Sequence, residues 1–211
     1  MNLRYPLILM SICAVFTISS CTSPSGGCPD CNYPPGIDVD PVDGNNFVTL
    51  NRTRQWRASV NGVVLSPSEV VWTTTRGTIT PQGLLTAPET PTTATPPART
   101  DWVKVQRTNP NSGPKSGVNE ATGPFWAVFL PSVQSFSSPT PMPVASGTAV
   151  VLAFQFSDGD ASLYTGSTLV QSGLASGGNL TVRPTTTTTY TLKVTNLAKD
   201  SVTQDLTVTV Q

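Results

Sequence analysis

The stretch SEVVWTTTRGTITPQGLLTAP, residues 68–88, decides the fold through the spacing of its apolar residues and through its turn. Val70 and Trp72 stand two positions apart, so they lie on one face of a β-strand. Residues 80–83 read TPQG and place Pro second and Gly fourth, which is typical of a β-turn. The stretch therefore predicts a meander of short strands joined by tight turns.

The segments around this stretch continue the β-pattern. In residues 45–62 the apolar side chains fall on even positions, as one half-buried strand or a bulged pair of strands requires; they are Val48, Leu50, Trp56, Ala58 and Val60. Further on, DWVKVQRT at 101–108 and FWAVFLP at 125–131 supply a closing pair of strands. The sequence thus predicts one folded segment over residues 37–131.

A second folded segment is expected over residues 132–211, because alternation resumes there in three places. Its in-phase residues are Val150, Leu152, Phe154 and Phe156, then Tyr190, Leu192 and Val194, and last Leu206, Val208 and Val210. Between them, SDGD at 157–160 predicts a turn in which glycine supplies positive φ. The five threonines at 185–189 favour a strand because their side chains are β-branched.

The composition limits both size and function. A chain of 211 residues with 20 Pro, 16 Gly and only 11% charged residues is typical of two small β-domains. Its formal net charge is zero, so the sequence predicts no nucleic-acid partner. It has no histidine, which excludes a Ser-His-Asp relay and the usual zinc ligand. We expect no cofactor and no enzyme activity.

Two motifs resemble the bacterial Ig-like domains. The first consists of Trp72, the triplet Gly77–Ile79, and Gly83–Pro88; the second is TTTTTYTLKVTN at 185–196, which is similar to a last hairpin of these modules. The resemblance implies an all-β fold with two Ig-like antiparallel β-sandwich domains in tandem, residues 37–131 and 132–211. It also implies that Trp72 fills the middle of a sandwich and that Tyr190 forms a tyrosine corner.

Residues 1–20 have the layout of an export signal, with Arg4 followed by an apolar run. The run of about thirteen residues is shorter than the roughly twenty that a membrane span needs. Ile18, Ser19, Ser20 and Cys21 resemble the bacterial lipoprotein lipobox. That resemblance implies cleavage before Cys21 and acylation of its thiol and amine, and Thr22 in place of Asp implies an outer-membrane location. The alternative is an ordinary secretory leader whose cleavage site lies near a cysteine.

Residues 21–36 are rich in Pro, Gly and Ser and predict a flexible tether. Cys28 and Cys31 lie inside it as CPDC. In an oxidising envelope we expect them to form a local disulfide, with redox or metal chemistry and intermolecular crosslinking as the alternatives. Cys13 leaves with the leader.

These features predict a non-enzymatic, lipid-anchored protein of the bacterial cell envelope that serves as a spacer, adhesion or assembly module. The alternative is a carbohydrate- or protein-binding module with ligand contacts from Trp102, Trp126 or Tyr164. Long Pro-rich loops at 89–100 and 108–124 are either a partner site or unstructured padding.

Acidic residues offer two weaker hypotheses. Asp38, Asp40 and Asp43 could hold calcium, although their spacing matches no standard calcium loop and an ordinary strand and turn is the expected reading. A glycosidase would need two carboxylates facing each other across a cleft, and Glu69, Glu89 and Glu120 stand in turn-like contexts without a motif.

Overall fold

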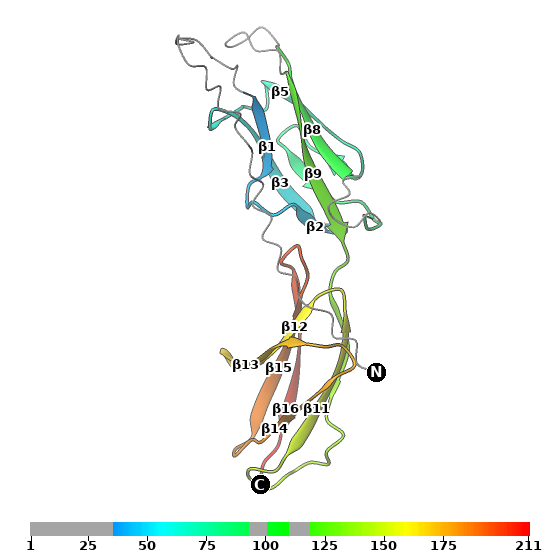
Figure 1. The fold of residues 1–211 in the computed structure, drawn as a ribbon, viewed down its shortest axis with the longest axis vertical. Coiled ribbons are helices and arrows are strands. Elements are labelled where there is room, and N and C mark those ends of the chain that lie inside the picture. Colours follow the sequence, from blue (N-terminus) through cyan, green and yellow to red (C-terminus); the bar gives the residue numbers. More distant parts are fainter. Residues whose placement is uncertain (1–35, 93–100, 110–118) are drawn as a thin grey trace, which may run out of the picture. The chain divides into compact units, whose positions relative to one another are not determined.

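The computed structural model describes residues 36–92, 101–109 and 119–211, and every regular element in these ranges is a β-strand. Figure 1 shows the strands grouped into two sandwiches, one ending with β9 and the other beginning with β10. Each sandwich has its own cluster of buried apolar side chains, and the two clusters share no residue. The predicted leader, Cys21, the pair Cys28 and Cys31, and nearly all of the tether lie outside the described residues.

The first sandwich consists of two sheets. One has the order β1-β3-β7-β6, with β4 also paired to β3; its strands are β1 (Ile37–Pro41), β3 (Thr53–Val60), β4 (Val63–Val64), β6 (Thr78–Ile79) and β7 (Leu84–Thr86). The other has the order β2-β9-β8-β5; its strands are β2 (Phe47–Thr49), β5 (Val70–Thr74), β8 (Asp101–Arg107) and β9 (Glu120–Val128).

This strand order is that of an Ig sandwich. The constant-type Ig domain joins strands A, B, E and D in one sheet and C, F and G in the other. The order β1-β3-β7-β6 opposite β5-β8-β9 reproduces it, strand for strand. An additional short strand, β2, runs parallel to β9, so this sheet is not wholly antiparallel as the sequence suggested. The all-β, Ig-like prediction is confirmed.

The second sandwich has a closely similar order. One sheet is β10-β11-β14, from β10 (Ser132–Ser137), β11 (Val150–Ser157) and β14 (Asn179–Val182). The other is β13-β12-β15-β16, from β12 (Asp160–Thr165), β13 (Thr168–Leu174), β15 (Thr188–Thr195) and β16 (Ser201–Val208). In the Ig lettering these sheets are A-B-E and C′-C-F-G, which is the same topology with the fourth strand on the other sheet.

Trp56 fills the centre of the first sandwich. It is 1% exposed, and its ring lies where a Cβ on Gly123 would approach within 2.5 Å. Trp72, which the sequence places in that role, is only half-buried; it packs against the edge of the core, and its ring lies next to Gly83. The prediction for Trp72 is therefore right in its strand and wrong in its burial, because strand β3 provides a tryptophan closer to the centre.

Of two further local predictions for the first sandwich, one is confirmed and one is wrong. The TPQG turn is confirmed, since the N–H of Gly83 donates to the carbonyl of Thr80 at 2.9 Å. Residues 45–62 form two strands, β2 and β3, that belong to different sheets. A left-handed Asn51 lies between them, so the even-numbered apolar residues do not form one continuous face.

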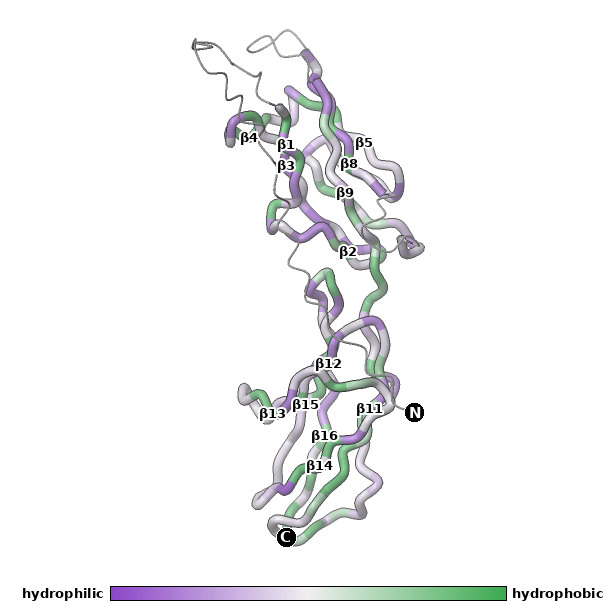
Figure 2. Tube along the Cα trace, in the orientation of Figure 1, coloured by the Kyte–Doolittle hydropathy of each residue, from purple (hydrophilic) through white to green (hydrophobic). Residues whose placement is uncertain are grey.

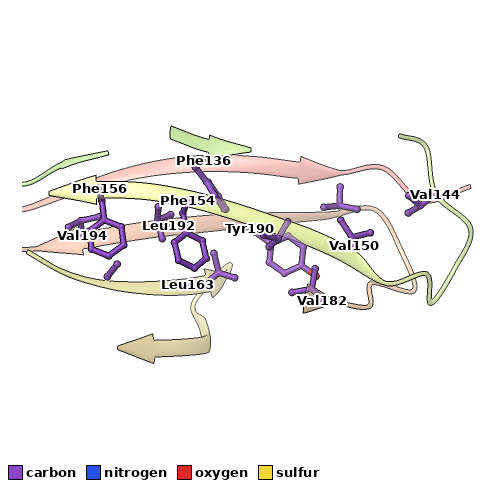
Figure 3. Close-up of a cluster of buried hydrophobic side chains, with 13 residues drawn as sticks. Phe136, Val144, Val150, Phe154, Phe156, Leu163, Val182, Tyr190, Leu192 and Val194 are labelled. Carbon is purple, nitrogen blue, oxygen red and sulfur yellow. The ribbon is translucent and has the colours of Figure 1, made fainter. Parts of the chain in front are cut away.

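The core of the second sandwich follows the predicted alternation closely. Figure 3 shows Phe154, Tyr190 and Leu192 among the side chains that point between its two sheets. Val150, Leu152, Phe154, Phe156, Tyr190, Leu192, Val194 and Val208 are all buried, while Leu206 and Val210 are half-buried against them. Figure 2 shows the corresponding apolar segments in green within the strands.

Two details of this sandwich differ from the sequence prediction. In the SDGD turn it is Asp158 that has positive φ, at 62°, and not Gly159. Glycine is needed at 159 because a Cβ there would lie 2.7 Å from the carbonyl oxygen of Thr195. The tyrosine corner is wrong, since the hydroxyl of Tyr190 makes no hydrogen bond to any described residue.

The predicted loop 108–124 is shorter than expected. Strand β9 already begins at Glu120, so residues 120–124 belong to the sheet. Residues 110–118 and 93–100 lie outside the described residues, and the proposal that these loops carry function stays a prediction.

Hydrogen bonds join the turn between β15 and β16 to the first sandwich. The side-chain amide of Asn196 donates to Thr49 Oγ1 at 2.9 Å and to the carbonyl of Phe129 at 2.8 Å. The Arg54 guanidinium donates to the carbonyl of Ala198 at 3.0 Å.

The residues that the structure describes contain no helix long and apolar enough to cross a membrane.

Candidate binding face

The outer face of sheet β2-β9-β8-β5 carries two of the three predicted ligand contacts. Strand β8 alternates strictly, with Asp101, Val103 and Val105 buried and Trp102 and Lys104 half-exposed on the other side. Strand β9 does the same, with Phe125 and Ala127 buried and Trp126 half-exposed. The period of two therefore places the apolar core on one side and the tryptophans on the outer side.

The strand register brings these aromatic residues together. Trp102 on β8 lies opposite Pro124 on β9, and Phe47 on β2 lies opposite Trp126. Because Pro124 and Trp126 are two residues apart on one strand, all four share a face, with Trp102 and Trp126 in diagonal positions about 7–8 Å apart. The rings of Phe47 and Trp126 are 5.5 Å apart between centroids. We call Phe47, Trp102, Pro124 and Trp126 the aromatic face.

The backbone holds Trp102 in place from strand β5. The N–H of Trp102 donates to Thr75 Oγ1 at 2.9 Å, and the N–H of Thr75 donates to the carbonyl of Trp102 at 3.1 Å. These two bonds continue the β5–β8 pairing beyond the last residue of β5. These bonds fix the backbone of Trp102 next to β5 and so fix the point on the sheet from which its ring extends.

Pro124 and Trp126 are positioned by Asn46. Proline has no N–H, so it is tolerated in a strand only where no ladder bond is required. Here β2 has not yet begun, and the side-chain amide of Asn46 donates to the carbonyl of Pro124 at 2.9 Å. The N–H of Trp126 donates to the carbonyl of Asn46 at 3.0 Å. A single residue before β2 therefore fixes this part of β9.

A hollow of about 310 Å³ lies beside Trp102; it is lined by Thr73, Thr74, Thr75, Trp102, Lys104 and Thr122. Thr73 and Thr122 are exposed, and their hydroxyls make no hydrogen bond to a described residue. Lys104 is paired with Glu120 at 2.6 Å. The hollow therefore offers two unpaired hydroxyls and one ammonium, which a carboxylate outside the lining already neutralises, next to an indole ring.

Tyr164, the third predicted contact, belongs to a different surface. It lies on β12 of the second sandwich, half-buried, opposite Thr191 on β15 and Leu169 on β13. The structure does not bring it together with Trp102 or Trp126, which are on strands of the first sandwich.

The three calcium candidates do not form a common site. Asp38 and Asp40 lie at exposed, alternate positions of β1, and Asp43 follows that strand. The carboxylate of Asp43 is bound to the Arg54 guanidinium at 2.6 Å, which competes with any cation. Among the described residues, no group of three or more His, Cys, Asp or Glu side chains could hold a metal ion.

A larger hollow of about 570 Å³ has both acidic and apolar walls, including Phe129, Asp158, Asp160, Asn196 and Leu197. None of the predicted ligand contacts lines it. Of its two carboxylates, Asp158 lies on the turn before β12 and Asp160 is the first residue of β12.

The carboxylates considered for an enzyme are engaged locally. The backbone N–H of Ser66 donates to Glu69 at 2.7 Å and its hydroxyl at 2.8 Å, and these bonds hold the pKa of Glu69 below its ordinary value of 4.5. Glu120 is the partner of Lys104. Neither these two residues nor the exposed Glu89 lines the hollows described above.

Sequence reasoning found Trp102 and Trp126 but missed Phe47, Pro124, Thr73 and Thr122. Their role depends on which strands are neighbours, and the parallel pairing of β2 with β9 has no signal in the sequence. The one local signal was the alternation in β8, which separates Trp102 and Lys104 from the buried valines.

Comparison with known proteins gives no family. No protein-family model matches the chain, and no curated protein matches it. Among solved structures, the fibronectin(III)-like modules of Clostridium thermocellum CbhA are 11% identical, cover 83% of this chain and 94% of that chain, and have a TM-score of 0.48.

Two other solved structures are similar to the chain in the same range. A C-terminal fragment of intimin, solved with the intimin-binding domain of its translocated receptor, is 14% identical, covers 83% of this chain and 63% of that chain, and has a TM-score of 0.44. A bacterial ice-binding adhesin is 17% identical, covers 84% of this chain and 65% of that chain, and has a TM-score of 0.32. The strand order, and not these similarities, defines the sandwich type.

Proposed function

We propose that the protein is a non-enzymatic, lipid-anchored component of a bacterial cell envelope whose Ig-like sandwiches act as a spacer, adhesion or assembly module. The observation that carries the proposal is the order of parts along the chain. A lipobox-like ISSC at 18–21 precedes a tether and then two sandwiches, each with its own core. Three acyl chains on one cysteine would hold such a protein at a membrane permanently.

Labelling with palmitate in a bacterial host tests the anchor. The wild-type chain should incorporate the label and fractionate with membranes, and Cys21→Ala should lose both properties, because only Cys21 accepts lipid. Cys13→Ala is the matched control, since it removes a cysteine of the leader and should leave labelling intact. Unlabelled wild-type protein in the soluble envelope fraction would contradict the proposal.

The outer membrane is the proposed location, on the basis of Thr22. In a host that reads Asp after the lipidated cysteine as a retention signal, Thr22→Asp should move the protein to the inner membrane. Equal distribution of both proteins would argue against this assignment.

The tether carries Cys28 and Cys31, which we assign to a local disulfide. Alkylation of the purified protein should modify neither cysteine before reduction and both afterwards. Modification without reduction would instead favour redox or metal chemistry at these cysteines. A crosslinked dimer on a non-reducing gel would favour an intermolecular disulfide.

A second candidate function is a carbohydrate- or protein-binding module, and the aromatic face is the observation that favours it. Two half-exposed tryptophans on one sheet face, beside a hollow with unpaired hydroxyls, have no role in either core. Such a module would also be non-enzymatic and is compatible with the same anchor.

A further inference from the structure

We infer that the aromatic face binds a neutral polysaccharide, whose sugar rings stack on Trp102 and Trp126 and whose hydroxyls bond to Thr73 and Thr122. The inference rests on the proposed function and deepens its binding alternative. The four residues come from three neighbouring strands, β5, β8 and β9, which lie side by side in Figure 1.

The first step concerns the shape of the ligand. The outer face of the sheet carries the two indoles in diagonal positions of β8 and β9. An aromatic ring offers a broad apolar surface to a flat partner. A pyranose ring provides that partner, because its C–H groups gather on one face while its hydroxyls lie at the edge.

The second step concerns the polar groups at the edge. The hydroxyls of Thr73 and Thr122 border the hollow beside Trp102 and have no hydrogen-bond partner among the described residues. Each can both donate and accept a hydrogen bond, as a sugar hydroxyl can. Thr75, in contrast, already accepts the N–H of Trp102. Two free hydroxyls next to a ring match a ligand that carries hydroxyls around an apolar face.

The third step concerns charge. Lys104 is the basic residue of the hollow, and its ammonium is 2.6 Å from the carboxylate of Glu120. An anionic polymer would have to compete with Glu120 for this ammonium and would meet no other cation among the lining residues. The face thus favours a neutral glycan over a charged one.

The fourth step concerns length and the alternative of a protein partner. Trp102 and Trp126 stand on different strands in diagonal positions, so an oligosaccharide can contact both side chains and a single sugar only one. A specific protein interface buries about 800 Å² per partner around an apolar centre. The outer face adds one exposed apolar residue, Val71 of β5, to the four residues of the aromatic face, and it is bordered by threonines and an ion pair. Such a face fits a narrow polymer better.

Affinity electrophoresis of the full chain in detergent, through gels that contain a neutral polysaccharide, tests the inference. A panel of β-glucan, galactomannan and xyloglucan should include at least one polymer that retards the wild type, while anionic alginate should not. Trp102→Ala and Trp126→Ala should each weaken binding about tenfold or more, as expected for a central aromatic contact. Thr73→Val should weaken it by a smaller factor, with Trp102→Phe retaining part of the binding.

Tyr164→Ala is the matched control, because it deletes a half-buried aromatic side chain of the other sandwich and should leave retardation unchanged. Thermal melts of each variant separate loss of binding from loss of folding. The inference is overturned if no neutral polymer retards the wild type, if alginate is preferred, or if folded Trp102→Ala binds like the wild type. In each of these cases palmitate labelling at Cys21 can still succeed, so failure of this inference and failure of the proposed function are distinguishable.

Discussion

Asp101 is a fully buried charged residue at the start of β8. Its carboxylate accepts hydrogen bonds from the Arg76 guanidinium, at 3.2 Å, and from the hydroxyl of Thr92. Arg76 also donates to the carbonyl of Thr90 at 2.7 Å. This network holds both ends of the segment between Thr92 and Asp101, where the predicted loop 89–100 lies.

Removing this carboxylate should destabilise the first sandwich. Asp101→Ala leaves the Arg76 charge without its partner, and we expect a loss of about 3 kcal/mol, the lower end for buried pairs because Arg76 is 31% exposed. All four tryptophans are in the first sandwich, so tryptophan fluorescence during urea unfolding reports on it. Glu120→Ala, which breaks the exposed pair with Lys104, should cost less than about 1 kcal/mol. Equal losses in both variants would contradict the network.

Tyr190 contributes through its ring and not through its hydroxyl. Burial raises the pKa of Tyr190 above its ordinary value of 10.0. The unfolded chain therefore loses this proton first, and the stability linked to it is complete below pH 10 and falls as the pH rises toward the folded pKa. Tyr190→Phe should cost under about 1 kcal/mol at pH 7, since no hydrogen bond is lost.

Thermal melts at alkaline pH test this account of Tyr190. Melts monitored by far-ultraviolet circular dichroism should show that the wild type loses stability above pH 10 faster than Tyr190→Phe does. A large loss at pH 7 would instead mean that the hydroxyl makes the hydrogen bond of a tyrosine corner.

Strand β9 shows how one glycine makes room for a core. Gly123 has no positive φ, yet a Cβ there would lie 2.5 Å from the Trp56 ring and 2.8 Å from the carbonyl oxygen of Val39. Gly123→Ala should therefore cost about 1–3 kcal/mol through overpacking. Gly36→Ala is the control, because nothing lies within 4 Å of its added Cβ. Fluorescence-detected unfolding of both variants checks this, and a neutral Gly123→Ala would show that Trp56 is loosely packed.

The elements that the sequence predicted well are those with long, strict alternation. Strand β11 buries every second residue, and β15 does so from Tyr190 onward, so their pattern alone identifies the core. The sequence predicts a loop at the start of β9 because this part contains Gly123 and Pro124, and both residue types are depleted in strands. Both have a specific reason to be there, the Trp56 ring and the Asn46 contact, and such tertiary reasons leave no periodic signal.

The candidate site was predictable only in part, for a related reason. The sequence predicts that Trp102 and Trp126 lie on a closing pair of strands, and the structure shows that alternation in β8 and β9 turns both away from the core. Which strands are neighbours, and in what register, depends on the packing of the whole sandwich. Phe47 therefore entered the aromatic face only through the pairing of β2 with β9.

At the scale of the whole molecule, Asn196 links the two sandwiches. It is 6% exposed, its side-chain N–H groups donate to Thr49 Oγ1 and to the carbonyl of Phe129, and its side-chain oxygen Oδ1 accepts the N–H of Asp200. Asn196→Ala leaves buried partners without hydrogen bonds, which should cost about 2–3 kcal/mol. Because Thr49 belongs to the first sandwich, tryptophan fluorescence should detect the change although residue 196 is in the second.

An exposed hydrogen bond on β15, the strand that ends just before Asn196, gives the control. Thr189→Ala breaks the pair of hydroxyls with Thr207 and should change stability by less than about 0.5 kcal/mol. If Asn196→Ala altered circular dichroism melts without moving the fluorescence transition, the two sandwiches would unfold independently.

The central claim is that lipid on Cys21 holds two Ig-like sandwiches at an envelope membrane. Mass spectrometry of the amino-terminal peptide of the protein isolated from its own membrane tests it most directly. The account predicts a peptide that begins at Cys21 and carries a diacylglyceryl thioether and an acylated amine. A peptide that retains residues 1–20, or one with unmodified Cys21, would contradict it.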